Sequence, residues 1–333
     1  MNYSKIMGAF AAIAVAGYTA GAAAQMEVKI GYATINDPQQ ALGMEIEKRL
    51  AANPDMKMSG RNFPAGQIGS IPRMIEGLQF GTLELMITPP GFLIGLNPAL
   101  QVLDAPGVFD DVDHADKTVN DPEFYSKYSK LTTDKGVTML NLYIYGPTSI
   151  ASLRPIRTLE DLKGMKIRVL ATKMESALVS KFGATGVPVS YTEVLPALQQ
   201  GTLDGARTAI IVMTGSQFYT VTKFITVIES GMVPSATFAS NAFLKKLSAQ
   251  QREFLTKMVK DLTPFVHESA KESGLKAEQI WKDNGAEVIR LSDDDQKEFI
   301  ERVRPLGDEF LGSNPQTKDM FEALKASAAR ARG

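Results

Sequence analysis

A chain of 333 residues with 36 basic and 37 acidic side chains has a formal net charge of −1, so it carries no excess positive charge for binding a nucleic acid. It contains no cysteine, which excludes disulfides, thiolate metal sites and cysteine catalysis. Its two histidines, His114 and His267, lie far apart in the sequence and do not suggest a metal site. The length indicates two domains.

The first 24 residues have the layout of a secretory signal peptide. Lys5 provides a positive start, residues 6–16 form an apolar run, and three alanines ending at Ala24 provide a small-residue cleavage site. The run is short for a membrane span, which needs about 18 or more apolar residues. We therefore expect export to the bacterial periplasm with cleavage of this segment, and a retained N-terminal anchor is the alternative.

The next part of the chain alternates between predicted strands and helices. Residues 28–33 alternate in polarity and predict a strand, and Asp37-Pro38 then predicts the start of a helix. A strand over 56–63, a helix over 71–80 and a strand over 83–88 follow. This order predicts an α/β domain with largely parallel strands.

A second series of strands and helices begins at residue 137. We expect strands over 137–145, 166–170 and 187–191, with helices over 174–182 and 193–200. Gly146-Pro147 is expected to break the first of these strands, and Thr192 to cap the second helix. This series predicts a second α/β domain.

The C-terminal part is predicted to be mainly helical. Residues 248–284 have apolar positions spaced for one buried helix face, and Pro264 and Gly274 are the points where this helix would kink or split. A strand over 287–291 and a terminal helix over 293–310 complete the expected elements.

One arginine stands inside a predicted strand. Arg168 lies between Ile167 and Val169, so its side chain points to the opposite face from both. A guanidinium cannot be neutralised, and burying it alone is costly. Its partner is either a carboxylate of the protein or one that arrives from outside. Taken alone, the strand favours an exposed arginine or an internal ion pair.

Several segments resemble a known family in both order and spacing. The segment 154–169 reads Arg-Pro-Ile-Arg-Thr-Leu-Glu-Asp-Leu-Lys-Gly-Met-Lys-Ile-Arg-Val. The other matching segments are 63–69, 75–85, 102–109, 192–205, 218–224 and 281–291. Together they resemble the periplasmic solute-binding subunits of TRAP (tripartite ATP-independent periplasmic) transporters, the DctP-type proteins, over essentially the whole mature chain.

The resemblance implies a two-lobed periplasmic-binding-protein fold of the α/β class. Mostly parallel sheets would be flanked by helices, with a long helix, here within 248–284, spanning both lobes. We expect lobe I to comprise 25–145 plus about 234–272, and lobe II to comprise 146–233 plus about 273–333. The ligand would lie in the cleft between lobes that close by hinge motion, and the protein is expected to be a monomer.

The resemblance also implies roles for single residues. Arg168 would form a bidentate salt bridge with a ligand carboxylate, since its planar fork of donors matches a planar acceptor. Tyr191 stands where the family usually has phenylalanine and would pack against the ligand. Thr208 replaces an asparagine that often contacts the ligand carboxylate. Arg207 replaces an acidic residue and would add positive charge near the cleft, unless it is solvated or ion-paired.

Thr148 is a further departure, because several members of the family have there a second arginine that contacts the acid. Its absence argues against recognition of sialic acid and against a two-arginine dicarboxylate clamp. Ligands in open α/β sheets bind outside the carboxyl ends of strands. The additional candidate contacts at such ends are Asn36, Asp37, Thr88, Pro89 and Tyr145.

We therefore expect a periplasmic binding protein, and not an enzyme, that captures an organic acid without a cofactor or metal. The ligand is expected to be a monocarboxylate, and the partners to be the small and large TRAP membrane subunits. The residue patterns of common hydrolases, zinc proteases and phosphate loops do not occur. A C4-dicarboxylate ligand, or a sensor subunit that presents its ligand to a membrane kinase, are the alternatives.

Overall fold

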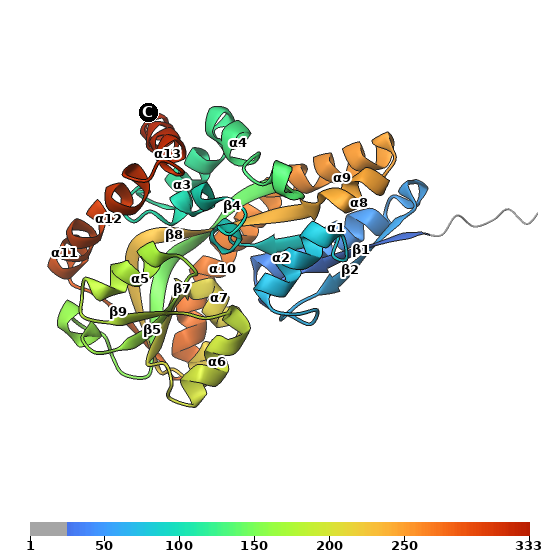
Figure 1. The fold of residues 1–333 in the computed structure, drawn as a ribbon. Helices are drawn as coiled ribbons and strands as arrows, with labels where there is room; N and C mark the ends of the chain where they lie inside the picture. Colours follow the sequence, from blue (N-terminus) through green and yellow to red (C-terminus); the bar gives the residue numbers. More distant parts are fainter. Residues whose placement is uncertain (1–24) are drawn as a thin grey trace, which may run out of the picture.

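The computed structural model describes residues 25–333, which form two lobes joined by two long strands (Figure 1). The predicted signal peptide, residues 1–24, lies outside the described residues. Within 25–333, no helix is both long and apolar enough to cross a membrane. Buried apolar side chains from both lobes form one continuous core.

The first lobe has the predicted alternation of strands and helices. Its elements are β1 (Met26–Gly31), α1 (Pro38–Ala51), β2 (Met58–Phe63), α2 (Ile71–Phe80) and β3 (Leu85–Thr88). β1 lies between β2 and β3 and pairs with both in parallel. Asp37 caps α1 by accepting a hydrogen bond from the Gln40 backbone, and Pro38 occupies the first turn, as the sequence predicted.

The second lobe repeats this arrangement. Its elements are β5 (Lys166–Val169), α5 (Lys173–Ser180), β6 (Thr185–Pro188), α6 (Tyr191–Gln199), β7 (Gly205–Ala209) and α7 (Ile210–Gly215). β5 pairs in parallel with β6 and β7. The prediction for the start of α6 was wrong by two residues, because Ser190 and not Thr192 is the cap and the helix begins at Tyr191.

Two long strands, β4 (Val137–Ser152) and β8 (Phe224–Ser240), run antiparallel through both lobes. They join the lobes into one sheet of order β2-β1-β3-β8-β4-β7-β5-β6, with β9 (Glu287–Arg290) paired to β8. The sheet is therefore parallel within each lobe and antiparallel at the crossing. The prediction that Gly146-Pro147 ends β4 was wrong: the strand continues, with register shifts on either side of these residues.

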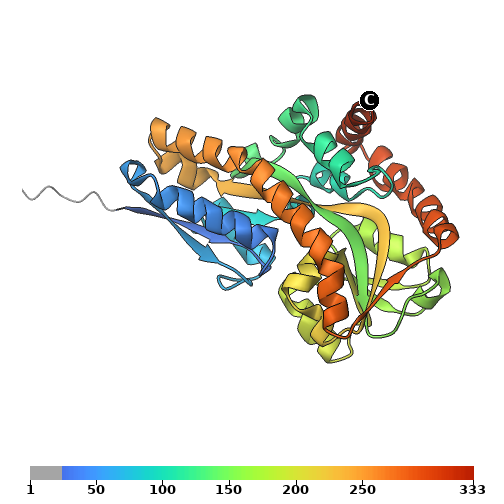
Figure 2. The same cartoon turned by 180° about the vertical axis from the view of Figure 1, so that it is seen from behind.

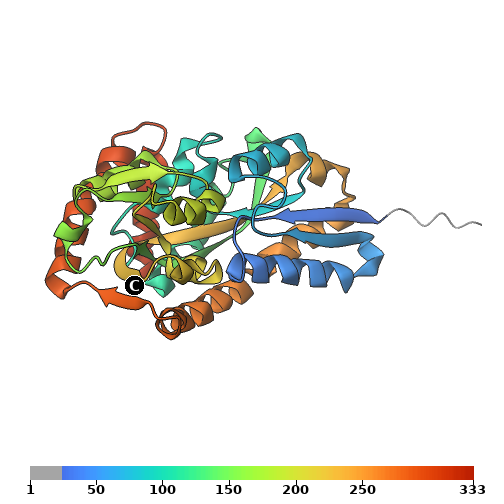
Figure 3. The same ribbon diagram turned by 90° about the horizontal axis from the view of Figure 1, so that it is seen from below.

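The predicted helix over 248–284 is two helices. After α8 (Asn241–Lys246), α9 (Ala249–Asp261) ends just before Pro264, and α10 (Thr263–Asp283) continues through Gly274 without a break. α10 packs on α1 of the first lobe and on α7 and β9 of the second, so it spans both (Figures 2 and 3). Near its end, the buried indole of Trp281 donates a 2.8 Å hydrogen bond to Thr214 Oγ1.

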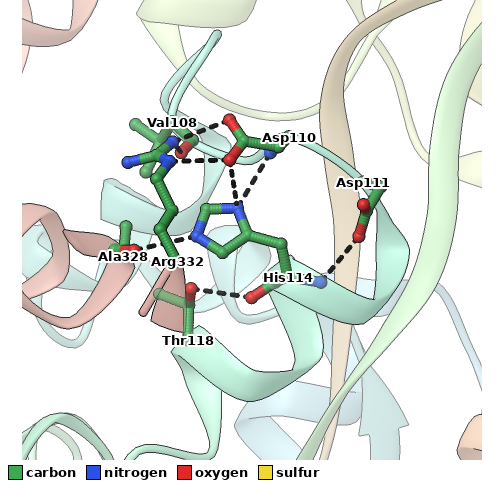
Figure 4. Close-up of polar contacts among 7 residues, drawn as sticks. All are labelled: Val108, Asp110, Asp111, His114, Thr118, Ala328 and Arg332. Atoms are coloured by element: carbon green, nitrogen blue, oxygen red, sulfur yellow. Dashed lines mark hydrogen bonds and ion pairs between the residues drawn. The ribbon is translucent and has the colours of Figure 1, made fainter. Parts of the chain in front are cut away.

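The C-terminal segment returns across the molecule. The predicted helix over 293–310 ends earlier, as α11 (Asp293–Val303), and is followed by the short α12 (Pro305–Gly307) and by α13 (Lys318–Ala331), which was not predicted. α13 packs on α3 (Val112–Val119) and α4 (Pro122–Tyr128). His114 fixes this contact, since its Nε2 lies 2.9 Å from the Ala328 carbonyl oxygen, and Arg332 pairs with Asp110 (Figure 4).

Candidate ligand-binding site between the lobes

A cavity of about 30 Å³ lies between the lobes, at the carboxyl ends of several strands. The first lobe contributes Ala33, Thr34, Gln39, Ile71, Thr88, Pro89 and Phe92 to its walls. The crossing strands contribute Tyr145 and Val233, and the second lobe contributes Arg168, Leu170, Tyr191, Thr208 and Val212. The volume is little more than that of a water molecule. The lobes must therefore separate to admit an organic ligand.

Arg168 is the charged residue of this cavity. Ile167 and Val169 on either side point into the core, so strand alternation turns the guanidinium toward the cavity, where it is 1% exposed. Its Nε donates a 3.3 Å hydrogen bond to the Val189 carbonyl oxygen. Within residues 25–333, no acidic side chain forms an ion pair with it. Burial lowers the pKa of Arg168 to about 10, so it remains cationic at neutral pH.

Tyr191 forms the aromatic wall beside this cation. The Arg168 guanidinium carbon lies 5.8 Å from the centroid of the Tyr191 ring, within the range of a cation–π contact. The other contacts of Tyr191 hold the ring in place: its hydroxyl donates to the Val212 carbonyl oxygen at 2.9 Å, and its ring stacks on Phe218. Tyr191 can therefore offer a ligand its ring, whereas its hydroxyl is already used.

Asp37 and Asn36 are not among the residues that line the cavity. The Tyr145 hydroxyl donates to the Asp37 carboxylate, which also accepts a hydrogen bond from the Gln40 backbone. Burial raises the pKa of Asp37 to about 6. The Asn36 side chain donates to the Gly215 carbonyl oxygen at 3.2 Å. Of the first-lobe and crossing-strand candidates, the structure thus places Thr88, Pro89 and Tyr145 in the wall.

Arg207 and Thr148 lie outside the cavity, and their guanidinium and hydroxyl bind each other. Arg207 is 2% exposed and forms a buried ion pair with Glu175. Its Nη2 donates to Thr148 Oγ1 at 3.1 Å and to Ser230 Oγ at 2.9 Å. The alternative of an ion-paired arginine therefore describes Arg207 in this structure. Thr208, the next residue, does line the cavity.

Sequence reasoning did not find several residues of the wall. Thr34 lies in the loop after β1, and Gln39 lies in the first turn of α1. Both follow the carboxyl end of β1, where the strand-end rule applies. Leu170 follows the Arg168 strand directly. Val212 and Val233 had no signal, because valine in a strand or helix reads as ordinary core.

A larger cavity of about 500 Å³ lies between β4 and α10. Its walls are mostly apolar, and the charged side chains among its lining residues lie at the surface. Its lysine, Lys271, is already paired with Asp113 at 3.1 Å. Size alone would favour this cavity, but a buried cation without an acid partner within residues 25–333 makes the smaller one the candidate site for an anion.

Close contacts hold the lobes together around the smaller cavity. The hydrogen bond from the Asn36 side chain to the Gly215 carbonyl oxygen joins the loop after β1 to the end of α7. A Cβ added to Gly215 would lie 2.2 Å from the Ile35 carbonyl oxygen, far below a normal contact. Gly66 likewise faces the Thr192 methyl group across the cleft. Glycine at 215 is therefore required for the lobes to meet as they do.

We expect Gly215→Ala to weaken ligand binding by about 5- to 150-fold, because a clash with backbone that costs ~1–3 kcal/mol opposes closure. The two lobes should still fold, since the glycine has an ordinary helical conformation. Calorimetric titration of the variant measures the effect. Gly274→Ala is the matched control, as an added Cβ there meets open space. Equal losses of affinity in both variants would contradict a role of Gly215 in closure.

The two lobes, the crossing strands and the enclosed cationic cavity define a solute-binding protein that closes around an anion. Residues 33–314 match the DctP family model, described as bacterial extracellular solute-binding protein, family 7. The chain belongs to this family. It is therefore a periplasmic binding protein and not an enzyme, and the expected DctP-type membership is confirmed.

Individual relatives agree with this assignment. The 2,3-diketo-L-gulonate-binding periplasmic protein YiaO of Escherichia coli K12 is 26% identical, covering 93% of this chain and 94% of the relative. The C4-dicarboxylate-binding periplasmic protein DctP of Rhodobacter capsulatus is 27% identical, covering 80% of each. A TRAP periplasmic solute-binding protein from Desulfovibrio salexigens, solved with bound orotic acid, has the same fold, with a TM-score of 0.85, 22% identity and coverage of 92% and 99%.

Proposed function

We propose that this protein captures an organic acid, a monocarboxylate, by a bidentate salt bridge from Arg168 and delivers it to TRAP membrane subunits. The observation that carries the proposal is a buried guanidinium in an enclosed cavity with no acidic partner within residues 25–333. An unpaired buried charge is costly. A ligand carboxylate supplies the missing charge and accepts two parallel hydrogen bonds.

Closure explains how this contact gains strength. When the lobes meet, water leaves the cavity and the ion pair forms in a medium of low dielectric constant, where attraction between charges is stronger. The Tyr191 ring remains against the guanidinium and limits its freedom. The site is thus organised before the ligand arrives, which reduces the entropy lost on binding.

The walls support a ligand with one carboxylate. Arg168 is the one cationic residue among those that line the cavity, whereas Ile71, Phe92, Leu170 and Val212 provide apolar surface. A second carboxylate would face these side chains without a cation. The named ligands of two of the related proteins, 2,3-diketo-L-gulonate and orotic acid, each have one carboxylate. The C4-dicarboxylate-binding relative supports the alternative.

A thermal-shift screen with matched compounds tests the ligand class. Orotate, phenylacetate and galactonate carry one carboxylate, succinate and malate carry two, and phenylacetamide carries none. We expect a monocarboxylate at one hundred times its Kd to stabilise the fold by about 2.7 kcal/mol and raise Tm measurably. The uncharged amide should have no effect.

A rise in Tm with succinate or malate alone would contradict the monocarboxylate proposal and favour the dicarboxylate alternative. Delivery needs a separate test, because a sensor subunit would use the same cavity. Uptake by proteoliposomes that contain the small and large membrane subunits, with and without this protein, distinguishes transport from sensing.

A further inference from the structure

Three charged side chains are buried together beside the ligand cavity. Asp104 ends the turn η3 (Pro98–Asp104), Glu175 lies in the first turn of α5, and Arg207 lies on β7. Their exposed fractions are 7%, 2% and 2%. If all three were ionised, two carboxylates would share one guanidinium and the cluster would have a net charge of −1.

Glu175 is the ion-pair partner of Arg207. The two side chains form a direct ion pair, and the remaining guanidinium donors bind Thr148 and Ser230. Glu175 also lies at a helix N-terminus, where a negative charge is favoured, and its backbone N–H is bound by Thr172. Glu175 and Arg207, as an ion pair, thus balance each other before Asp104 is counted.

Asp104 is the group without a partner. Its Oδ2 atom is buried and has no hydrogen-bond partner within residues 25–333. This oxygen lies against Gly91, so closely that an added Cβ would come within 2.6 Å of it. The charged groups that act on the carboxyl are Glu175 of α5 and Arg207 of β7, and the Asp104 carboxyl in turn helps to raise the pKa of Tyr128 of α4. Burial, assisted by Glu175 and opposed by Arg207, raises the pKa of Asp104 well above its usual range.

The cluster joins the two lobes. Asp104 and Gly91 belong to the turns that follow β3, whereas Glu175 and Arg207 belong to the second lobe. Pro89 and Phe92, which flank Gly91 in the turn after β3, line the cavity. When the lobes separate, Asp104 moves away from its charged neighbours in the second lobe, Glu175 and Arg207. Glu175 is close enough to Arg168 for its charge to act on that guanidinium. An anion bound at Arg168 therefore adds a further negative charge near the cluster.

We propose that Asp104 is a proton-binding site, and that the closed protein captures one proton there together with its anionic ligand. The proton makes the cluster neutral, so that a second negative charge can enter the adjacent cavity without repulsion from Asp104. The part that concerns the ligand rests on the proposed function, whereas the protonation of Asp104 does not.

The direction of the pH dependence follows from the raised pKa. The folded protein binds this proton more tightly than the unfolded chain. The stabilisation is therefore complete below the ordinary aspartate pKa of about 4 and is lost as pH rises toward the raised value. The unfolding equilibrium should shift by up to tenfold per pH unit in this window.

Asp104→Asn tests the proton site without any ligand, because asparagine is close in shape to a neutral aspartic acid. We expect the variant and the wild type to have similar Tm at pH 4.5. The variant should become progressively more stable than the wild type as pH rises to 8. Infrared difference spectra at pH 7 should also show a protonated-carboxyl band that the variant lacks. Parallel Tm curves, or no such band, would overturn the proposal.

Two control variants separate Asp104 from other carboxyls. Asp37 is also buried, with its pKa raised to about 6, so Asp37→Asn should alter the dependence of Tm on pH below pH 6 and retain the fall in stability above pH 6 that Asp104 causes. Asp134→Asn changes an exposed carboxyl and should follow the wild type. If Asp37→Asn removed the whole dependence, the proton would belong to Asp37 and the assignment to Asp104 would fail.

Calorimetric titration with orotate, phenylacetate and galactonate in phosphate and in Tris buffer tests the linkage. The two buffers release different heats on losing a proton, so the difference in binding heat counts the protons taken up. At a pH where ligand-free Asp104 is only partly protonated, we expect uptake of the remaining fraction of one proton, with Kd rising as pH rises, and no uptake by Asp104→Asn. Binding without uptake would overturn the linkage and leave the proposed function intact. Failure of all three acids to bind would contradict the proposed function and the linkage together, and leave the proton site to the first test.

Discussion

Replacing Arg168 with alanine should abolish binding of the acid ligand while leaving the protein folded. Loss of one partner of a buried, hydrogen-bonded charge pair costs about 2–5 kcal/mol of binding, which corresponds to roughly 30- to 5,000-fold in Kd. The fold should not suffer, because Arg168 has no acid partner within residues 25–333 and its burial is itself unfavourable. Calorimetric titration and thermal unfolding of the same preparation measure both effects.

Arg168→Lys separates charge from geometry. Lysine keeps a positive charge but loses the planar pair of donors, so we expect affinity between those of the wild type and the alanine variant. Arg61→Ala removes an exposed arginine at the first lobe and should bind normally. If Arg168→Ala bound the acid as tightly as the wild type, Arg168 would be a structural residue and the proposed salt bridge would be wrong.

Arg207→Ala should be the most destabilising single change in the buried charge cluster. Removing one partner of a buried ion pair costs about 3–5 kcal/mol, because the other charge is left in the interior. Here the guanidinium also donates to Thr148 and Ser230, whose hydroxyls would lose this donor. Urea unfolding should show a lower midpoint with an unchanged slope.

Glu175→Ala should cost less, because Asp104 remains to balance Arg207. The difference in unfolding free energy between Arg207→Ala and Glu175→Ala therefore measures the effect of Asp104, the carboxyl in excess of the one guanidinium. The double replacement Glu175→Met with Arg207→Met removes both charges and should recover much of the loss, as apolar replacements of buried ion pairs often do. A loss that is equal in both alanine variants would mean that Asp104 does not act on this pair.

Local sequence rules predicted the parts of the site that depend on local geometry. Arg168 could be placed because alternation in a short strand fixes the direction of its side chain. The alternation of strands and helices in each lobe predicted parallel pairing, and Asp37-Pro38 marked the start of α1. The family pattern added the cleft, which no local rule would reveal.

The parts that sequence reasoning missed depend on distant contacts. β8 was not predicted, since Ser, Thr, Gly231 and Pro234 interrupt its apolar pattern; the strand is held by pairing with β4 along most of its length. Gly146-Pro147 predicts a strand end for the same reason, because only the pairing with β8 carries β4 through these residues. Thr148 and Arg207 are separate candidates in the sequence, and the ion-paired alternative for Arg207 names no partner, whereas in the structure Glu175, 32 residues away, binds that arginine.

The indole of Trp281 gives this protein an internal optical probe. It is the single tryptophan of the chain, it is buried near the end of α10, and it is hydrogen-bonded to the residue before Gly215. Gly215 is the point at which α7 meets the first lobe. Separation of the lobes changes the surroundings of α7 and therefore of this ring. Tryptophan emission should thus follow opening and closing in real time, without a label or a second fluorophore to subtract.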